Sequence, residues 1–107
     1  MPRVAVFLAD QEGRFLFADS TACEMLGYTQ AELLQLSIRD TYSPGEIYLS
    51  EQRIRDIKAG KELTFRREMR RKDGSYLRVE VSSRMLADGR FHAIVRELEP
   101  DDAAGEA

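Results

Sequence analysis

Two Asp-Gly pairs in the second half of the chain place the strongest constraint on its fold. Asp73-Gly74 and Asp88-Gly89 each stand between segments in which apolar and polar residues alternate. Asp-Gly between such segments is typical of a turn that joins antiparallel strands. The C-terminal half is therefore predicted to form three consecutive strands. Their alternating apolar residues are Leu63, Phe65 and Met69, then Leu77, Val79, Val81 and Met85, then Phe91, Ala93 and Val95.

The first half of the chain indicates a hairpin followed by a short helix. Residues 4–9 and 14–18 are apolar segments separated by a polar turn, as in two paired strands. Asp19 or Ser20 can then accept a hydrogen bond from the free N–H groups of a helix, which Gly27 is expected to end. A compact unit of two strands and one helix is predicted here.

Two capping-box patterns predict further helices. Thr29 with Glu32, and Ser43 with Glu46, have the spacing at which a hydroxyl and a carboxylate satisfy each other's backbone N–H groups. Pro44 stands where the second helix would begin, so its missing N–H costs nothing. This longer helix is expected to end near Gly60. Its apolar face carries Ile47, Ile54 and Ile57, and its water-facing side carries Glu51, Arg53, Arg55, Asp56 and Lys58.

Length and composition set the outer limits. A chain of 107 residues, 43% hydrophobic and 33% charged, suits one globular domain. A half-apolar sheet and amphipathic helices bury their faces only against each other, so the α+β class is expected, with a five-stranded antiparallel sheet and several helices packed on one face. The domain is predicted over residues 1–99, and the acidic residues 100–107 as a disordered tail or linker. A cytoplasmic location without membrane contact is expected, because no apolar stretch approaches the length of a bilayer span.

Several segments, in this order, resemble the PAS sensory domain family with its PAC segment. Residues 10–22 are similar to the family's turn, strand and helix cap, and residues 26–34 to its Gly-Tyr-x-x-x-Glu-Leu motif. Residues 71–75 resemble its central hairpin. Residues 94–98 resemble its closing strand, with Glu and Leu where the family pattern has Asp and Ile. The resemblance covers nearly the whole of residues 4–99.

Two departures from the family pattern bear on any ligand. Asp19 replaces a usual asparagine, and Ser43 replaces a common histidine before the proline. Because one fold hosts many functions, the ligand has to be argued from the site.

The resemblance implies a sensory module of signal transduction. Such a module senses a small ligand or mediates dimerisation, and relays the change through its last strand, here Arg96, Glu97 and Leu98, to an effector domain. Relatives imply a longer parent protein, such as a histidine kinase of a bacterial two-component system. A ligand-free module for protein–protein interaction, acting by dimerisation, is the alternative. No effector motif is present, and the residues indicate no enzyme, since neither a phosphate loop nor a group of catalytic residues is found.

Cofactor chemistry can be weighed from two residue types. Haem in this family is commonly held by a histidine on the helix after the proline, yet the only histidine is His92, on the last predicted strand. Light-sensing relatives bind flavin through a cysteine in an Asn-Cys-Arg motif, whereas residues 36–40 read Leu-Ser-Ile-Arg-Asp. Cys23 lies instead on the first helix, where a small buried thiol is expected. No cofactor is predicted, haem and photoreactive flavin are disfavoured, and an unidentified small metabolite stays open.

The apolar pattern allows a small pocket between the longest helix and the sheet, but the favoured interpretation is a completely filled core, because protein interiors pack densely. Strict alternation turns Arg67 inward, where its charge needs a partner or an anionic ligand such as a carboxylate or acyl head group. The favoured interpretation is a solvated Arg67, because a bulge near the sheet edge would shift the strand by one residue. Ser83 could add a hydrogen-bond donor. The candidate pocket residues are Ile47, Ile54, Phe65, Arg67, Val79, Val81, Ser83 and Val95.

The outward face of the sheet is the candidate surface for a homodimer. Two copies could bury the same apolar residues symmetrically. The candidate dimer residues are Val4, Val6, Leu8, Ile94 and Leu98. Nucleic acid is not an expected partner, because the formal net charge is −3 and aromatic residues are sparse around the arginines. Those arginines are Arg66, Arg70, Arg71, Arg78 and Arg84.

Overall fold

A five-stranded antiparallel sheet forms one layer of the molecule, as the alternation of apolar residues predicted. The computed structural model describes residues 2–99, and the predicted tail at residues 100–107 lies outside them. The strands run in the order β2-β1-β5-β4-β3, so the N-terminal hairpin joins the C-terminal three strands through β1 and β5. Their bounds are β1 Val4–Ala9, β2 Phe15–Ala18, β3 Leu63–Arg70, β4 Tyr76–Met85 and β5 Phe91–Glu97.

Both Asp-Gly turns connect neighbouring strands as expected. Gly74 and Gly89 adopt left-handed backbone conformations, with φ of +88° and +89°, which glycine tolerates at little cost. The carboxylates of Asp73 and Asp88 each accept a hydrogen bond from the backbone N–H two residues further on. The side chain before each glycine therefore stabilises the turn that its glycine allows.

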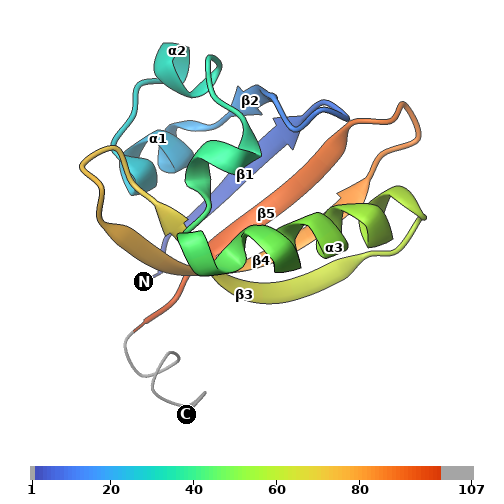
Figure 1. Cartoon of the computed structure of the whole chain (residues 1–107). Helices are drawn as coiled ribbons and strands as arrows, with labels where there is room; N and C mark the ends of the chain where they lie inside the picture. The colour runs from blue at the N-terminus through green and yellow to red at the C-terminus, as the bar shows by residue number, and fades with distance from the viewer. Residues whose placement is uncertain (1, 100–107) are drawn as a thin grey trace.

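All helices lie on one face of the sheet (Figure 1). Asp19 caps α1, because its carboxylate accepts hydrogen bonds from the backbone N–H groups of Ala22 at 2.9 Å and of Val6 at 3.2 Å. The capping box of Thr29 and Glu32 at the start of α2 forms as predicted. The helical elements are α1 Ser20–Leu26, α2 Gln30–Leu33, η1 Ile38–Thr41, η2 Pro44–Glu46 and α3 Ile47–Lys58, where η denotes a 3-10 helix.

The start of α3 differs from the prediction. The Ser43 side chain makes no capping hydrogen bond, and a short 3-10 turn precedes the α-helix. Glu46 does not reach back to Ser43, because its carboxylate binds the Arg53 guanidinium and the backbone N–H of Glu68 on β3. Ile47 is 51% exposed, and Ser50 takes the buried position in the first turn of α3. The prediction that Ile47 faces the sheet was therefore wrong.

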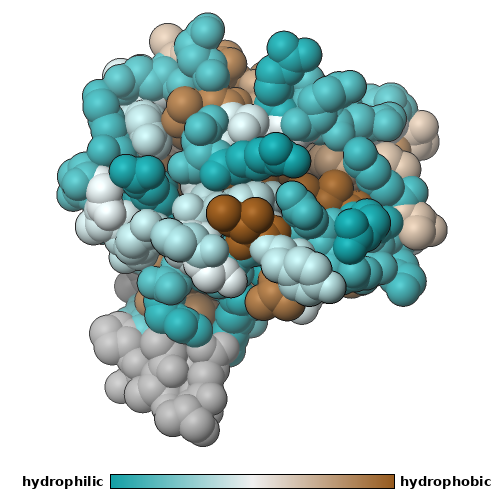
Figure 2. Space-filling view, viewed as in Figure 1, coloured by the Kyte–Doolittle hydropathy of each residue, from teal (hydrophilic) through white to brown (hydrophobic). Residues whose placement is uncertain are grey.

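The core lies between the helices and the inward face of the sheet. It is densest beneath α1 and α2, where Ala22, Met25, Leu26 and Leu33 are almost fully buried. Beneath α3, by contrast, Ile57 is the only fully buried apolar residue that the helix supplies. Hydrophobic surface shows on the outer side of α3 (Figure 2), where Ile47, Tyr48 and Leu49 are exposed. The two ends of the helical layer are thus packed differently.

Candidate ligand-binding site

A cavity of about 80 Å³ lies between α3 and the sheet. Six of the eight predicted pocket residues line it, which are Ile54, Phe65, Arg67, Val81, Ser83 and Val95. Val79 does not line the cavity, because its side chain is fully buried among core neighbours. Ile47 does not line it either, because it is exposed on the far side of α3. Whether a ligand fills the cavity stays a prediction at this point.

Sequence reasoning missed several residues of the cavity wall, which include Phe7, Phe15, Tyr42, Ser50, Arg53 and Phe91. The helical spacing held a usable signal for two of them. Ser50, Arg53, Ile54 and Ile57 follow the i, i+3, i+4, i+7 pattern of one helix face. The polarity of Ser50 and Arg53 concealed this face from a search for apolar residues. Arg53 was predicted to face water, yet its side chain is only 20% exposed.

Arg67 is the most deeply buried charged residue of the described chain, at 7% exposure. Its Nη1 donates to the carbonyls of Thr41 at 3.2 Å and Glu68 at 3.1 Å, and its Nη2 donates to Thr41 Oγ1 at 2.7 Å. Burial lowers the pKa of Arg67 to about 10, because the surroundings solvate its charge poorly. The interpretation that Arg67 is solvated was therefore wrong, and the inward alternative holds.

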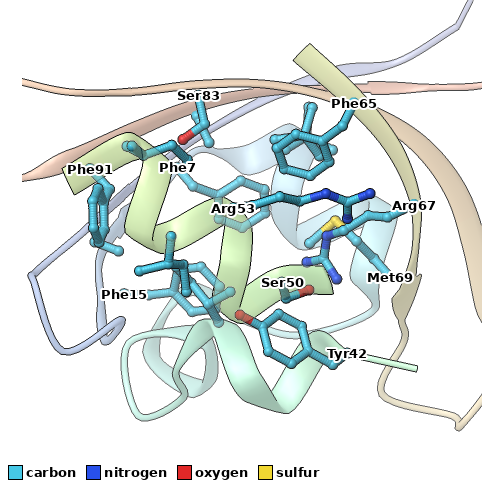
Figure 3. A pocket seen from close by; sticks show the side chains of 17 residues that line it. Phe7, Phe15, Tyr42, Ser50, Arg53, Phe65, Arg67, Met69, Ser83 and Phe91 are labelled. Atoms are coloured by element: carbon cyan, nitrogen blue, oxygen red, sulfur yellow. The ribbon is translucent and has the colours of Figure 1, made fainter. Parts of the chain in front are cut away.

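Arg53 reaches the same end of the cavity from α3. Its guanidinium stacks on the Phe65 ring, 4.1 Å from the ring centroid, and its Nη1 lies 3.2 Å from Glu46 Oε2. Cation–π stacking of this kind favours arginine over lysine. Figure 3 shows Arg53 and Arg67 together at one end of the cavity, with Phe91 at the other. The site thus has a cationic end and an apolar end.

Two hydroxyl groups complete the cationic end. Burial raises the pKa of Tyr42, so the phenol stays neutral, and its ring lies 5.3 Å from the Arg67 guanidinium carbon. Ser50 is 4% exposed, and its Oγ has no hydrogen-bond partner among residues 2–99. Ser50 Oγ lies near the Tyr42 hydroxyl and opposes the rise of the Tyr42 pKa as a hydrogen-bond donor would, but the two groups do not meet hydrogen-bond geometry. A buried hydroxyl without a partner is costly, so Ser50 is a donor in need of an acceptor.

The wall of the cavity contains neither cysteine nor histidine. Cys23 packs against the core from α1, and His92 lies on β5 opposite Leu8 and Arg84. Within residues 2–99, no three His, Cys, Asp or Glu side chains gather as metal ligands. The residues present therefore do not fit a thiol-linked flavin or a histidine-ligated haem.

The outward face of the sheet carries four of the five predicted dimer residues. Val4 and Ile94 are exposed, and Val6 and Leu8 are half-buried. Phe17 extends this apolar face, because it pairs with Leu8 across β2 and β1.

Leu98 does not belong to that face, and its prediction as a dimer residue was wrong. It follows β5, donates its backbone N–H to the Arg78 carbonyl, and is only 8% exposed. A side chain so covered offers a partner almost no surface.

The predicted relay residues are anchored to two neighbouring strands. Glu97 binds Arg3 through two side-chain hydrogen bonds of 2.8 and 2.9 Å, and this pairing lowers the pKa of Glu97. Arg96 lies 3.5 Å from Glu80 on β4. Leu98 is held to β4 through the Arg78 carbonyl. The end of β5 is thus tied to the first residues before β1 on one side and to β4 on the other.

The five-stranded antiparallel sheet with helices on one face places the chain in the class of small α+β domains. A family model described as a PAS domain matches residues 3–98. The chain belongs to the PAS domain family, as its motifs indicated. No protein in the search of curated proteins matches it significantly.

Solved structures agree with this assignment. A domain of a sensory box sensor histidine kinase/response regulator from Geobacter sulfurreducens is 28% identical with a TM-score of 0.80, covering 88% of this chain and 82% of its own. A PAS domain from a two-component sensor histidine kinase is 26% identical with a TM-score of 0.70, covering 90% and 84%. A light-oxygen-voltage domain, studied with a flavin analogue, has a TM-score of 0.81 at 18% identity, covering 95% and 82%. The last likeness shows the fold alone.

Proposed function

We propose that this chain is a non-catalytic sensory input module, which binds a small molecule in the cavity beneath α3 and passes the change to an effector domain. The observation that carries the proposal is the polar lining of one cavity end. In a filled core, the unpaired Ser50 hydroxyl and the buried Arg67 charge would only destabilise the fold, since both are costly to bury. A ligand that satisfies them accounts for both residues.

The route of the signal is the last strand. Val95 forms part of the cavity wall, Glu97 ends the same strand, and Leu98 follows it directly. A ligand that displaces Val95 would alter the backbone hydrogen bonds of Glu97 with Arg3 and of Leu98 with Arg78. These bonds hold the end of the last strand in place. Relatives named as sensor histidine kinases support an effector in a longer parent protein. A histidine kinase, a bacterial source and a cytoplasmic location stay predictions.

Native mass spectrometry of freshly purified protein, beside its denatured mass and its visible absorption, tests this proposal. We expect the native protein to carry a small colourless mass that denaturation removes. A native mass equal to that of the bare chain, together with no change in melting temperature across a library of small metabolites, would contradict ligand sensing. The paired masses also give the subunit number.

Dimerisation through the outward face is the second candidate function. Val6 lies opposite Ile94, and Leu8 lies opposite Phe17, so apolar residues continue across β2, β1 and β5. A second copy of the chain is the proposed occupant, because a two-fold interface lets each copy bury the same residues. Sedimentation should show a dimer that Ile94→Asp dissociates, whereas Glu12→Lys, on the exposed β1–β2 turn, should not. A wild-type monomer at every concentration would contradict this candidate.

A further inference from the structure

The cationic end of the cavity holds more positive than negative charge. Two guanidinium groups, of Arg53 and Arg67, face it, and Glu46 is the carboxylate paired with Arg53. Arg67 has no carboxylate within ion-pair distance among the described residues, and its bonds go to carbonyls, a hydroxyl and an aromatic face. A buried charge is stabilised best by a partner of opposite sign, so one negative charge is missing from this site.

The hydrogen-bond donors that remain match a carboxylate. Arginine has five N–H groups, and the three bonds of Arg67 use both groups on Nη1 and one on Nη2. Its Nε–H and one Nη2–H are left over, and a guanidinium can present an Nε–H and an Nη2–H side by side on one edge. Two parallel N–H groups suit the two oxygens of a carboxylate. The unpartnered Ser50 hydroxyl adds a third donor on the α3 side.

The rest of the cavity limits the size and polarity of the ligand. Phe7, Phe15 and Phe91 line the part away from the arginines (Figure 3), where a second charge would find no partner. The volume of about 80 Å³ limits the buried part of a ligand to a few non-hydrogen atoms. A chain of a few carbon atoms fits this space, whereas a long fatty acid or a flavin does not.

Resting on the proposed sensory function, we propose that the ligand is a short-chain aliphatic monocarboxylate. Its carboxylate binds Arg67 and Ser50, and its hydrocarbon chain lies against the phenylalanines. Arg53 contributes charge from the opposite wall while its own partner stays Glu46. A dicarboxylate is disfavoured because its second charge would enter the aromatic end.

Calorimetric titration and thermal melting with butyrate test this assignment. Butyramide is the matched neutral probe, because it has the same size and shape without the charge, and succinate is the matched dicarboxylate. We expect butyrate to raise the melting temperature and to bind at least tenfold more tightly than either. Equal binding of butyrate and butyramide would overturn the carboxylate assignment while leaving a ligand-binding cavity in place. Binding of none of the three, with a different molecule retained in native mass spectra, would also overturn it and leave the sensory proposal standing.

Three variants locate the binding site. Arg67→Met should weaken butyrate binding at least tenfold and leave butyramide binding unchanged. Arg70→Met is its control, because Arg70 is exposed on the same strand, and it should bind butyrate like the wild type. Ser50→Ala should weaken butyrate binding several-fold, and it keeps the test decisive if Arg67→Met fails to fold. Unchanged butyrate binding in Ser50→Ala and in a folded Arg67→Met would overturn the assignment.

Discussion

Packing against the sheet differs between the region under α1 and α2 and the region under α3. Beneath α1 and α2, apolar side chains such as Leu26 and Leu33 are completely buried, and the helix starts are capped by Asp19 and Thr29. Beneath α3, the helix has no side-chain cap, and the space holds a cavity, a buried arginine and an unpaired hydroxyl. The α1–α2 region thus has a filled core and capped helices, whereas the α3 region departs from this pattern.

Under the proposed function, this departure marks the region that binds the ligand. Local choices in a sequence normally agree with the global structure, and violations collect at functional sites. Ser50 and Arg67 would be replaced by apolar residues if stability were the only demand on them. On that proposal, the α1–α2 region supplies the stability that the α3 region gives up for recognition.

Truncation of a buried leucine should separate the two regions most strongly. We expect Leu33→Ala to lower the free energy of unfolding by about 2–5 kcal/mol, because it leaves a void in a fully packed region. Ile54→Ala, in the half-buried cavity wall, should cost about 1–2 kcal/mol, because less apolar surface is lost there. Urea denaturation measures both. Equal costs would remove the distinction in packing.

Loss of the α1 cap comes next in size. Asp19→Ala should cost about 1–2 kcal/mol, because the carboxylate accepts hydrogen bonds from both Ala22 and Val6. Asp19→Asn should cost less than Asp19→Ala, since the amide oxygen can still cap the helix, although the amide NH2 group cannot accept from the Val6 N–H. The denaturant midpoints of the two variants measure these losses of stability. An Asp19→Ala midpoint equal to that of the wild type would show that the cap contributes nothing.

Low pH should weaken the ion pair between the relay residue Glu97 and Arg3. The pKa of Glu97 is lowered by its hydrogen bonds with Arg3, so its contribution to stability is complete above the ordinary glutamate value of 4.5 and is lost as pH falls through the lowered value. Glu97→Gln should cost at most about 1 kcal/mol at pH 7, because both side chains are partly solvated. The difference in free energy of unfolding between Glu97→Gln and the wild type should shrink below pH 4.5.

Urea melts of Glu97→Gln at several pH values give this gap directly. The exposed Glu12→Gln serves as the control and should follow the wild type at every pH. A gap that stays constant down to pH 3 would rule out the ion pair as its origin.

The smallest effect, and the one with an unusual sign, is expected at Ser50. Removing a buried hydroxyl without a partner in Ser50→Ala should leave stability unchanged or raise it by up to about 1 kcal/mol. Thr41→Val is the matched comparison, because Thr41 Oγ1 donates to the Ile38 carbonyl and accepts from Arg67. That variant should lose about 1–2 kcal/mol. Thermal melting that ranks Ser50→Ala as the less stable of the two would contradict the assignment of Ser50 to ligand binding.

The fold could be predicted from sequence because its signals are local. Asp73-Gly74 and Asp88-Gly89 fix turns through backbone conformations that only a few residues adopt, and the alternation of apolar residues fixes the sheet faces. The failure at Ser43 has a cause outside the local pattern. Glu46 is drawn away from its expected capping role by Arg53 and by β3, which are distant in sequence. Such competition is invisible in a local pattern.

The candidate site could be predicted only in part. Apolar residues such as Val81 and Val95 reach the cavity through strand alternation. The same rule turns Arg67 inward, but the solvated alternative was preferred because a bulge near the sheet edge could shift the strand by one residue. Arg53 and Ser50 were missed because polarity was taken as exposure, although their helical spacing matched Ile54 and Ile57. Leu98 was misplaced because alternation does not report what covers a residue past the end of its strand.

The most direct test of the account is a map of backbone amide chemical shifts in protein labelled with nitrogen-15, recorded while butyrate is added. The account predicts saturable shifts around Ser50, Arg67 and Val95 that continue to Glu97 and Leu98, with the amides of α1 and α2 unchanged. Shifts confined to α1 and α2 or to exposed residues, or none at saturating butyrate, would contradict a carboxylate-sensing cavity beneath α3.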